Sequence, residues 1–430
     1  MRDPILFRRT DVLSPDESDY WKDLLYRVSK IGTEVEVAPP KGEARSRLET
    51  FLHDALGPSG SMENLGPFGV LDVTPEHSGV EVRFIGRQPH FEALHKQYSA
   101  IFAILQEGGA RVRATCGLHF HLLTPTLAEP APEIILANMW NLVRRYAPEL
   151  RFLTSAGANR GALCRHRMYC SHLEMVRLSP GWMTMGKIAR ELKDSPRTPE
   201  HQNFLNLEHL GFTTTGDILP LHLEFRFPDM HFSPLTVAAE SLLFLGLLLK
   251  AVDLSQYGVV HVGKIVPWQR KVDLLDMLSN NDGDLATSGT GAVTDEVVSE
   301  LSEGAEELLD LLAPVYDRIG HGAGLEVLRA LARRPISLLR SAGYSWEEIE
   351  GVLQEAMTAD DVGLDDTDRR LMQRIELVEW SNLPSLEAWQ WHAARELYLT
   401  PQELERRLQL LAKRRGVRWE PRLGTFMFTS

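Results

Sequence analysis

The chain has 430 residues; 43% of them are hydrophobic, 24% are charged, and the formal net charge is −13. This composition is that of a globular protein and excludes a globally disordered chain, which would contain fewer apolar residues. No surplus of basic residues exists, so we predict no nucleic-acid partner. Three cysteines are too few to build a disulfide scaffold in a chain of this length, and we therefore expect a cytoplasmic protein.

No segment has the pattern of a membrane anchor. The N-terminal sequence MRDPILFRRTD is charged and lacks the apolar core of a signal peptide. The richest apolar run covers residues 242–249, contains Gly246 and ends before Lys250. It falls short of the roughly 18 apolar residues that suggest a membrane-spanning helix. We expect no association with a membrane.

Four segments with alternating or β-branched residues predict β-strands. They are KIGTEVEV (30–37), GVEVRFIG (79–86), ARVRATCGLHFHLL (110–123) and PLHLEFRF (220–227). Apolar residues that recur at intervals of three and four predict helices over 91–107, 132–147 and 234–252. The strands and helices do not alternate in regular short units, so we expect an α+β fold with an antiparallel sheet rather than a doubly wound parallel one.

The stretch SNNDGDLATSGTGAVTD (279–295) is polar and rich in glycine, which is typical of an interdomain linker or of a mobile loop over a site. Helical patterns dominate beyond it. Ser345 and Glu348 form one capping box, and Thr400 precedes a helix predicted over 401–414. We therefore expect a first domain over 1–265 and a mainly helical C-terminal region, 266–430, packed on it.

Four pairs of ionisable residues at spacing two lie in the predicted strands. The pairs are Glu34 and Glu36, Glu81 and Arg83, His119 and His121, and Glu224 and Arg226. Residues two apart in a strand point to the same face of the sheet. Half-buried strands normally keep one face apolar, so charged pairs inside hydrophobic strands need a reason. One reason is a network of structural ion pairs; the other is that the charged faces converge in one cleft.

The residue types indicate what such a cleft would bind. Carboxylates with one imidazole suit Mg²⁺ or Mn²⁺, which prefer oxygen ligands. An arginine beside them would contact phosphate oxygens. Metal ions and an arginine around one pocket are typical of phosphoryl transfer. Zinc is the minor alternative, because Cys116 lies three residues before His119 and so on the opposite face of a regular strand.

The order of these segments resembles that of a known family. LEFRFPD (223–229) is similar to the glutamine synthetase segment in which a Glu-x-Arg strand precedes Pro-Asp and a helix. GLHFHL (117–122) resembles the His-x-His strand of that fold, and GTEVEV (32–37) its opening Glu-x-Glu strand. A second acidic strand, GVEVRF (79–84), lies between them as in carboxylate–amine ligases of the amidoligase and glutamate–cysteine ligase group. The resemblance implies a curved antiparallel sheet with flanking helices, with 1–265 as the catalytic domain.

The resemblance further implies that five residues hold two magnesium ions. Glu34 and Glu36 would each hold one ion between the ATP phosphates and the substrate carboxylate. Glu81 would complete one metal site, and His119 would be a further ligand. Glu224 would bind the second ion.

The resemblance also implies contacts to the nucleotide. His121 would reach the ATP phosphates, and Arg226 would neutralise charge on the transferred γ-phosphoryl group. The segment 155–170 lies where such enzymes place anion-binding arginines, so Arg160, Arg165 and Arg167 are candidates; a solvated helix or loop is the alternative. The implied catalytic residues are Glu36, Arg226 and Arg160, and the implied cofactor-binding residues are His121, Arg226, Arg165 and Arg167.

The activity implied is that of an ATP-dependent carboxylate–amine ligase that uses Mg²⁺ or Mn²⁺. It would form an amide or peptide bond through an acyl phosphate and release ADP and phosphate. Its partners would be a small-molecule or peptide carboxylate and an amine acceptor, and a homo-oligomer is compatible with a fold that can build sites between subunits. Three alternatives stay open: a phosphotransferase of the same fold, a nucleotide-sensing protein without ligase activity, and a zinc hydrolase centred on His119 and His121.

Overall fold

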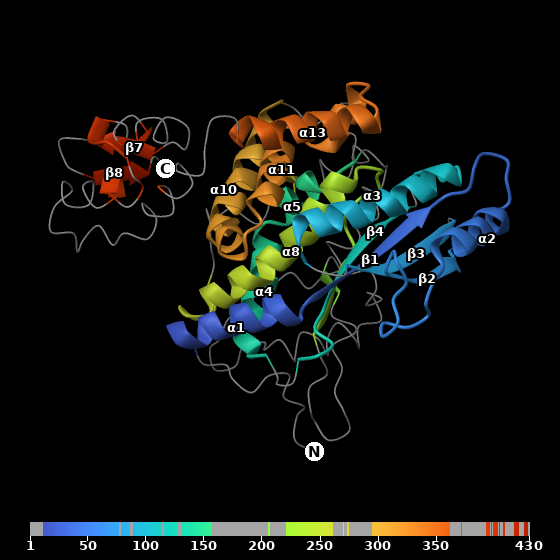
Figure 1. Cartoon of the computed structure of the whole chain (residues 1–430), viewed down its shortest axis with the longest axis horizontal. Coiled ribbons are helices and arrows are strands. Elements are labelled where there is room, and N and C mark those ends of the chain that lie inside the picture. Colours follow the sequence, from blue (N-terminus) through green and yellow to red (C-terminus); the bar gives the residue numbers. More distant parts are fainter. Residues whose placement is uncertain are drawn as a thin grey trace, which may run out of the picture. The chain divides into compact units, whose positions relative to one another are not determined.

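The computed structural model describes most of the chain up to residue 361 and short stretches beyond it (Figure 1). The described residues are 12–76, 79–86, 89–113, 116–127, 131–156, 205–206, 221–260, 270, 273–274, 295–361 and scattered residues between 371 and 428. The chain divides into two compact units, Met1–Gln354 and Glu355–Ser430. The expected division after residue 265 falls inside the first unit. In the second unit, strands β7 (Val417–Glu420) and β8 (Thr425–Phe428) form an antiparallel pair.

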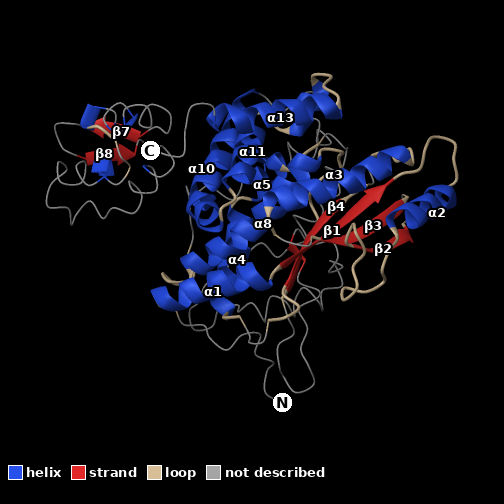
Figure 2. Cartoon of the chain, viewed as in Figure 1, coloured by secondary structure: helices blue, strands red, loops and turns tan. Residues whose placement is uncertain are grey.

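The first unit contains an antiparallel sheet with the strand order β2-β3-β1-β4-β6-β5. Strands β1 to β4 of this sheet are labelled in Figures 1 and 2. The strands are β1 (Lys30–Val37), β2 (Val70–Pro75), β3 (Val80–Ile85), β4 (Leu118–Leu123), β5 (Leu205–Asn206) and β6 (His222–Phe225). The expected α+β class with an antiparallel sheet is therefore confirmed. Each of the four predicted strand segments contains a strand, although the segment 110–123 becomes a strand only at Leu118. Before Leu118, Arg111 pairs with Ala38 only as an isolated bridge, and the Cys116 N–H donates to the Arg113 carbonyl.

One face of this sheet is apolar and packs against helices. Val35, Val82 and Phe120 point to this face and are buried. Helix α3 (Phe91–Glu107) and helix α8 (Pro234–Leu254) lie against each other beneath the sheet, and α2 (Arg45–Leu56) packs against β2. The ring of Phe244 in α8 stacks on that of Phe225 in β6 with a centroid distance of 4.0 Å. Because strand side chains alternate, the ionisable pairs are left on the other face.

Helix α8 is the central helix of the first unit. All its residues from 235 to 249 are buried, and α1 (Pro15–Val28), α4 (Glu133–Arg145), α10 (Asp295–Ile319) and α11 (Gly322–Arg333) pack around it. Among the described helices it alone is long and apolar enough to cross a membrane, but 94% of its apolar window is buried inside the protein. A helix that is apolar on all sides is typical of such a buried position.

The remaining helices agree with the sequence patterns in most respects. The helix predicted over 91–107 matches α3, and the one predicted over 234–252 is α8. The segment 132–147 divides at Tyr146 into α4 and α5 (Ala147–Leu153), with Pro148 in the first turn of α5. Helix α12 covers Ile336–Ser341, and α13 (Trp346–Asp361) begins after the predicted capping box, in which the Glu348 N–H donates to Ser345 Oγ at 3.2 Å. The stretch 279–294 lies outside the described residues, and the described part of 401–414 is helical at 401–402, 404 and 407–408.

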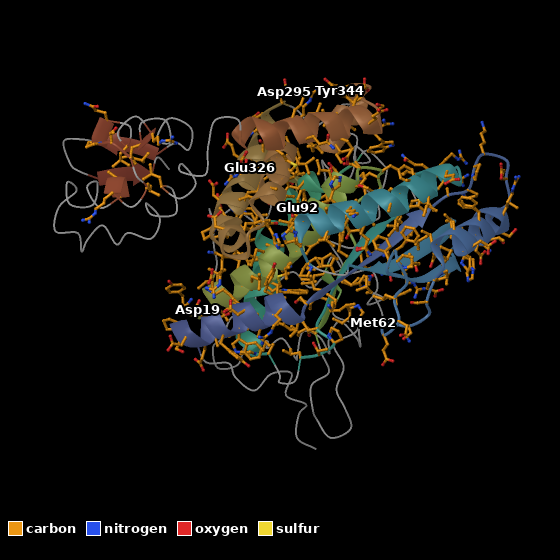
Figure 3. The ribbon with its side chains drawn as sticks, viewed as in Figure 1. Asp19, Met62, Glu92, Asp295, Glu326 and Tyr344 are labelled. Carbon is orange, nitrogen blue, oxygen red and sulfur yellow. The ribbon has the colours of Figure 1, made fainter. Side chains whose placement is uncertain are left out.

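Ion pairs on the surface connect neighbouring helices of the first unit. Asp19 on α1, labelled in Figure 3, accepts a hydrogen bond from Arg318 of α10 at 2.7 Å. Arg329 of α11 donates to Glu306 and Asp310 of α10, each at 2.7 Å. Exposed pairs of this kind contribute about 0.2–1 kcal/mol each, so the apolar packing around α8 dominates the stability of this region.

Candidate active site

The register of the sheet brings the ionisable pairs together on one face. Glu34 of β1 lies opposite Arg83 of β3 on one side and opposite His119 of β4 on the other. Glu36 lies opposite Glu81, and His121 lies opposite Glu224. Directly opposed residues of antiparallel strands share a face of the sheet. Three neighbouring strand pairings therefore gather the predicted residues of β1, β3, β4 and β6 side by side.

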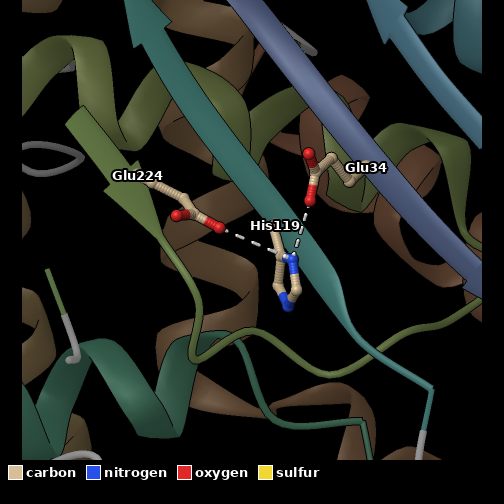
Figure 4. Close-up of side chains that lie close together, drawn as sticks. All are labelled: Glu34, His119 and Glu224. Atoms are coloured by element: carbon tan, nitrogen blue, oxygen red, sulfur yellow. Dashed lines mark hydrogen bonds and ion pairs between the residues drawn. The ribbon is translucent and has the colours of Figure 1, made fainter. Parts of the chain in front are cut away.

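Glu34, His119 and Glu224 form the centre of this face (Figure 4). His119 Nδ1 lies 3.1 Å from Glu34 Oε2 and 3.8 Å from Glu224 Oε1. One ligand atom of each residue lies within 4.8 Å of the other two, and no other group of three such side chains exists among the described residues. The side chains of His119 and Glu224 are 1% and 2% exposed. Two carboxylates and one imidazole fit a divalent cation that prefers oxygen ligands, such as Mg²⁺ or Mn²⁺.

Glu36 and Glu81 extend the centre along β1 and β3. Glu36 Oε1 lies 3.8 Å from His119 Nε2, and Glu36 Oε2 accepts the Gly117 N–H at 2.6 Å. Glu81 Oε1 accepts a hydrogen bond from Arg83 Nε at 2.5 Å. All four predicted carboxylates thus lie on the same polar face, two in the central group and two beside it.

The electrostatics of the face follow from this crowding of carboxylates. Burial alone would raise the pKa of Glu34, but hydrogen bonds and charges from His119 and His121 outweigh it and hold that pKa well below its usual range. Burial raises the pKa of Glu81 to about 7, and the neighbouring Glu34 carboxylate adds to this effect against the opposing influence of Arg83. A bound divalent cation would relieve the repulsion between these carboxylates.

The predicted phosphate-binding residues lie at the β6 side of the face. Arg226, the residue after β6, donates a hydrogen bond to Glu224 Oε1. His121 Nε2 lies 3.3 Å from Glu34 Oε1, and His121 Nδ1 lies 2.8 Å from Nε2 of His222. His222 is absent from the residues singled out in the sequence. The signal for it was available, because it stands two positions before Glu224 and therefore on the same face of the strand.

The loop after β6 is fixed by a buried ion pair. Asp229 accepts hydrogen bonds from Arg151 Nη2 at 3.1 Å and from the Ala156 N–H at 2.9 Å. Its backbone N–H donates to the Thr154 carbonyl, and it also forms a bridge with Gly117 next to β4. The Pro-Asp sequence of this segment therefore has a structural role in holding the end of β6 against α5 and β4.

Three predicted arginines, Arg160, Arg165 and Arg167, lie outside the described residues, as do two of the three cysteines. The third, Cys116, is buried just before β4. It does not belong to the metal-binding group of Glu34. The residues brought together are thus those of the four strands.

No protein-family model matches the chain, and no curated protein matches it. Among solved structures, the chain is similar to the crystal structure of the complex between prokaryotic ubiquitin-like protein Pup and its ligase PafA. The TM-score is 0.33 and the sequence identity 10%, over 76% of this chain and 73% of that chain. Any functional conclusion for this chain therefore rests on the residues of its own sheet.

Proposed function

We propose that the chain is an ATP-dependent carboxylate–amine ligase that uses Mg²⁺ or Mn²⁺. The observation that carries the proposal is the group of Glu34, His119 and Glu224, joined by Glu36 and Glu81 on one face of an antiparallel sheet. The substrates proposed are a small-molecule or peptide carboxylate and an amine acceptor, and the proposed compartment is the cytoplasm.

The carboxylates would hold the cations, and the cations would neutralise phosphate charge and bring the nucleotide and the substrate carboxylate together. Glu34, His119 and Glu224 supply one set of ligands. Glu36 lies on the other side of His119 and would hold a second ion, with Glu81 beside it. The sheet fixes these side chains in position before any ligand binds, which lowers the entropy cost of assembling the site.

The reaction proposed has two steps. An oxygen of the substrate carboxylate attacks the γ-phosphorus of ATP, the bond to the β-phosphate oxygen breaks, and ADP leaves. The amine nitrogen then attacks the acyl carbon, inorganic phosphate leaves, and the nitrogen loses a proton. Arg226 and His121 lie beside the carboxylates and would stabilise charge on the phosphate oxygens during the first step.

The test is the product formed from Mg-ATP, hydroxylamine and a pool of amino acids and small peptides. Hydroxylamine replaces the unknown amine and traps an acyl phosphate as a hydroxamate. We expect ADP together with a hydroxamate, both lost in Glu224→Gln and both kept in Glu347→Gln, a control that removes an exposed carboxylate of α13.

Other outcomes separate the alternatives. ADP with a stable phosphorylated product and no hydroxamate would replace the ligase with a phosphotransferase. Nucleotide binding without turnover, even with macromolecular carboxylates added to the pool, would favour a nucleotide-sensing protein. Turnover that persists in Glu224→Gln would show that the site lies elsewhere.

A further inference from the structure

We infer that Arg83 is a second oxyanion-binding residue of the polar face, which contacts a phosphate or carboxylate group of a reactant at the opposite end of the proposed cation site from Arg226. The register of the sheet sets four residues in one row. Arg83 of β3 lies opposite Glu34 of β1, and Glu34 lies opposite His119 of β4. The last residue of β6 lies opposite the residue after His119, so Arg226 stands at the level of His119 itself. The row therefore begins and ends with an arginine, and two ligands of the proposed cation lie between them.

The guanidinium of Arg83 is held in a fixed orientation and keeps one nitrogen for a ligand. Its Nε donates to Glu81 Oε1 at 2.5 Å, and its Nη2 donates to Thr74 Oγ1 of β2 at 3.4 Å. In the part of the chain that the structure describes, no group accepts a hydrogen bond from Nη1. The Arg83 side chain is 43% exposed, against 18% for Arg226. A ligand can therefore reach the two N–H groups of Nη1 without breaking either contact.

The charges near Arg83 determine when an anion can bind there. Glu81 and Glu34 lie 2.5 Å and 3.9 Å from its Nε, and Asp72 lies opposite it on β2. Three carboxylates repel an anion, so the arginine alone makes a poor anion site. A divalent cation held by Glu34 would offset two of these negative charges and make the field at Nη1 favourable for an anion. The inference therefore rests on the proposed function, which places a cation on this face.

The direction of the Arg83 side chain indicates a ligand group other than the one that Arg226 contacts. Neighbouring strands lie about 4.8 Å apart, so β3 and β6 are separated by about 14 Å. Arg83 Nη2 is bonded to Thr74 of β2, on the side of β3 away from β6. Arg226 is bonded to Glu224 of β6. Because a guanidinium presents a planar fork that suits both phosphate and carboxylate oxygens, the group at Arg83 is either a further phosphate of the nucleotide or an anionic group of the carboxylate substrate.

The test is isothermal titration calorimetry of the full chain with Mg-ATP and with AMP, together with the hydroxamate assay. Arg83→Met removes the guanidinium, and Arg83→Gln keeps an N–H donor for Glu81 but no charge. If the group is a nucleotide phosphate, both variants should weaken Mg-ATP binding about tenfold or more and leave the binding of AMP, which lacks the β- and γ-phosphates, within about twofold. If the group belongs to the carboxylate substrate, Mg-ATP binding should stay unchanged, and the KM of that carboxylate should rise about tenfold or more.

Two further variants separate ligand binding from general damage to the protein. Arg83→Lys keeps a positive charge and should recover part of the lost affinity or of the change in KM. Arg47→Met removes an arginine of α2 that is 78% exposed, and it should change neither quantity. A folded Arg83→Met or Arg83→Gln protein with unchanged Mg-ATP affinity and unchanged KM would overturn the inference. Equal losses for ATP and AMP would also overturn it, because they would show general damage to the site.

The outcomes also distinguish this inference from the proposed function. Hydroxamate formation by wild type, with the binding and kinetics of the Arg83 variants unchanged, would overturn the inference and leave the proposed function intact. If wild type forms no hydroxamate, the proposed function fails, and the Mg-ATP titration alone decides the inference. A loss of about tenfold in the variants would then support a phosphate contact at Arg83. An unchanged affinity, or no Mg-ATP binding by wild type, would overturn it.

Discussion

Replacement of Asp229 by alanine should strongly destabilise the first unit, because this residue holds the end of β6 through a buried ion pair. The Asp229 and Arg151 side chains are 0% and 3% exposed, with Arg151 Nη2 3.0 Å from Asp229 Oδ1. Removal of one partner from a buried pair costs about 3–5 kcal/mol, because the other charge stays in the interior. The Ala156 N–H also loses its acceptor, at about 1–3 kcal/mol. We therefore expect Asp229→Ala to lower the free energy of unfolding by an amount at the upper end of about 3–5 kcal/mol.

The assay is urea unfolding of the full chain, followed by far-ultraviolet circular dichroism. Asp229→Asn keeps an oxygen for the Ala156 N–H and should cost less than Asp229→Ala. The double variant Arg151→Met with Asp229→Leu removes both charges. It should be more stable, by about 2 kcal/mol or more, than the summed stability losses of the single variants Arg151→Met and Asp229→Leu predict. A cost below about 1 kcal/mol for Asp229→Ala would refute the reasoning, as would additive single and double variants.

The remaining predictions concern the sheet and the helices beneath it. Gly69→Ala should lower the free energy of unfolding more than Gly42→Ala does in the same urea assay. Both positions have φ in the left-handed region, which costs alanine about 1–2 kcal/mol. Only at Gly69 would a Cβ also lie 2.6 Å from a backbone oxygen, that of Ile85. Equal losses would contradict the crowding at Gly69. Phe244→Ala should lower the free energy of unfolding, measured by calorimetry, by about 3–5 kcal/mol, because the Phe244 ring is fully buried under β4 and β6. A loss of stability under about 1 kcal/mol would be inconsistent with that packing. Burial raises the pKa of Glu240 above its value in the unfolded chain, so wild type should lose stability relative to Glu240→Gln as the pH rises above about 4.3. Urea titrations of both proteins at pH 5 and pH 8 would measure this loss. A difference in unfolding free energy that is the same at both pH values would argue against the raised pKa.

The strands that carry the site were predictable because their pattern is local. Period-two alternation in 30–37 and 118–123 determines which side chains share a face, and the structure keeps that alternation in β1 and β4. Apolar periodicity similarly identified α3 and α8. The order of the strands in the sheet is a different matter, because it depends on contacts between residues far apart in sequence. The sequence patterns suggested that the charged faces meet, and only the register shows Glu34 between Arg83 and His119.

Other features were missed for identifiable reasons. Strand β2 has a mixed burial pattern and a register shift between Val70 and Asp72, so its alternation is weak. Helix α1 begins at a capping box of Ser14 and Glu17 that the patterns would have revealed. The contact between His121 and His222 is diagonal across two strands, and such pairs cannot be read from either strand alone.

The most direct test of the account is the binding of Mn²⁺ to the metal-free protein, followed by electron paramagnetic resonance with and without ATP. The account predicts saturable binding that excess Mg²⁺ displaces, because the ligands of Glu34, His119 and Glu224 favour hard cations. Affinity should fall more than about tenfold in Glu224→Gln and stay unchanged in Glu347→Gln. Absence of Mn²⁺ binding in both conditions, or binding that Glu224→Gln leaves intact, would contradict the central claim that this face of the sheet is a cation site.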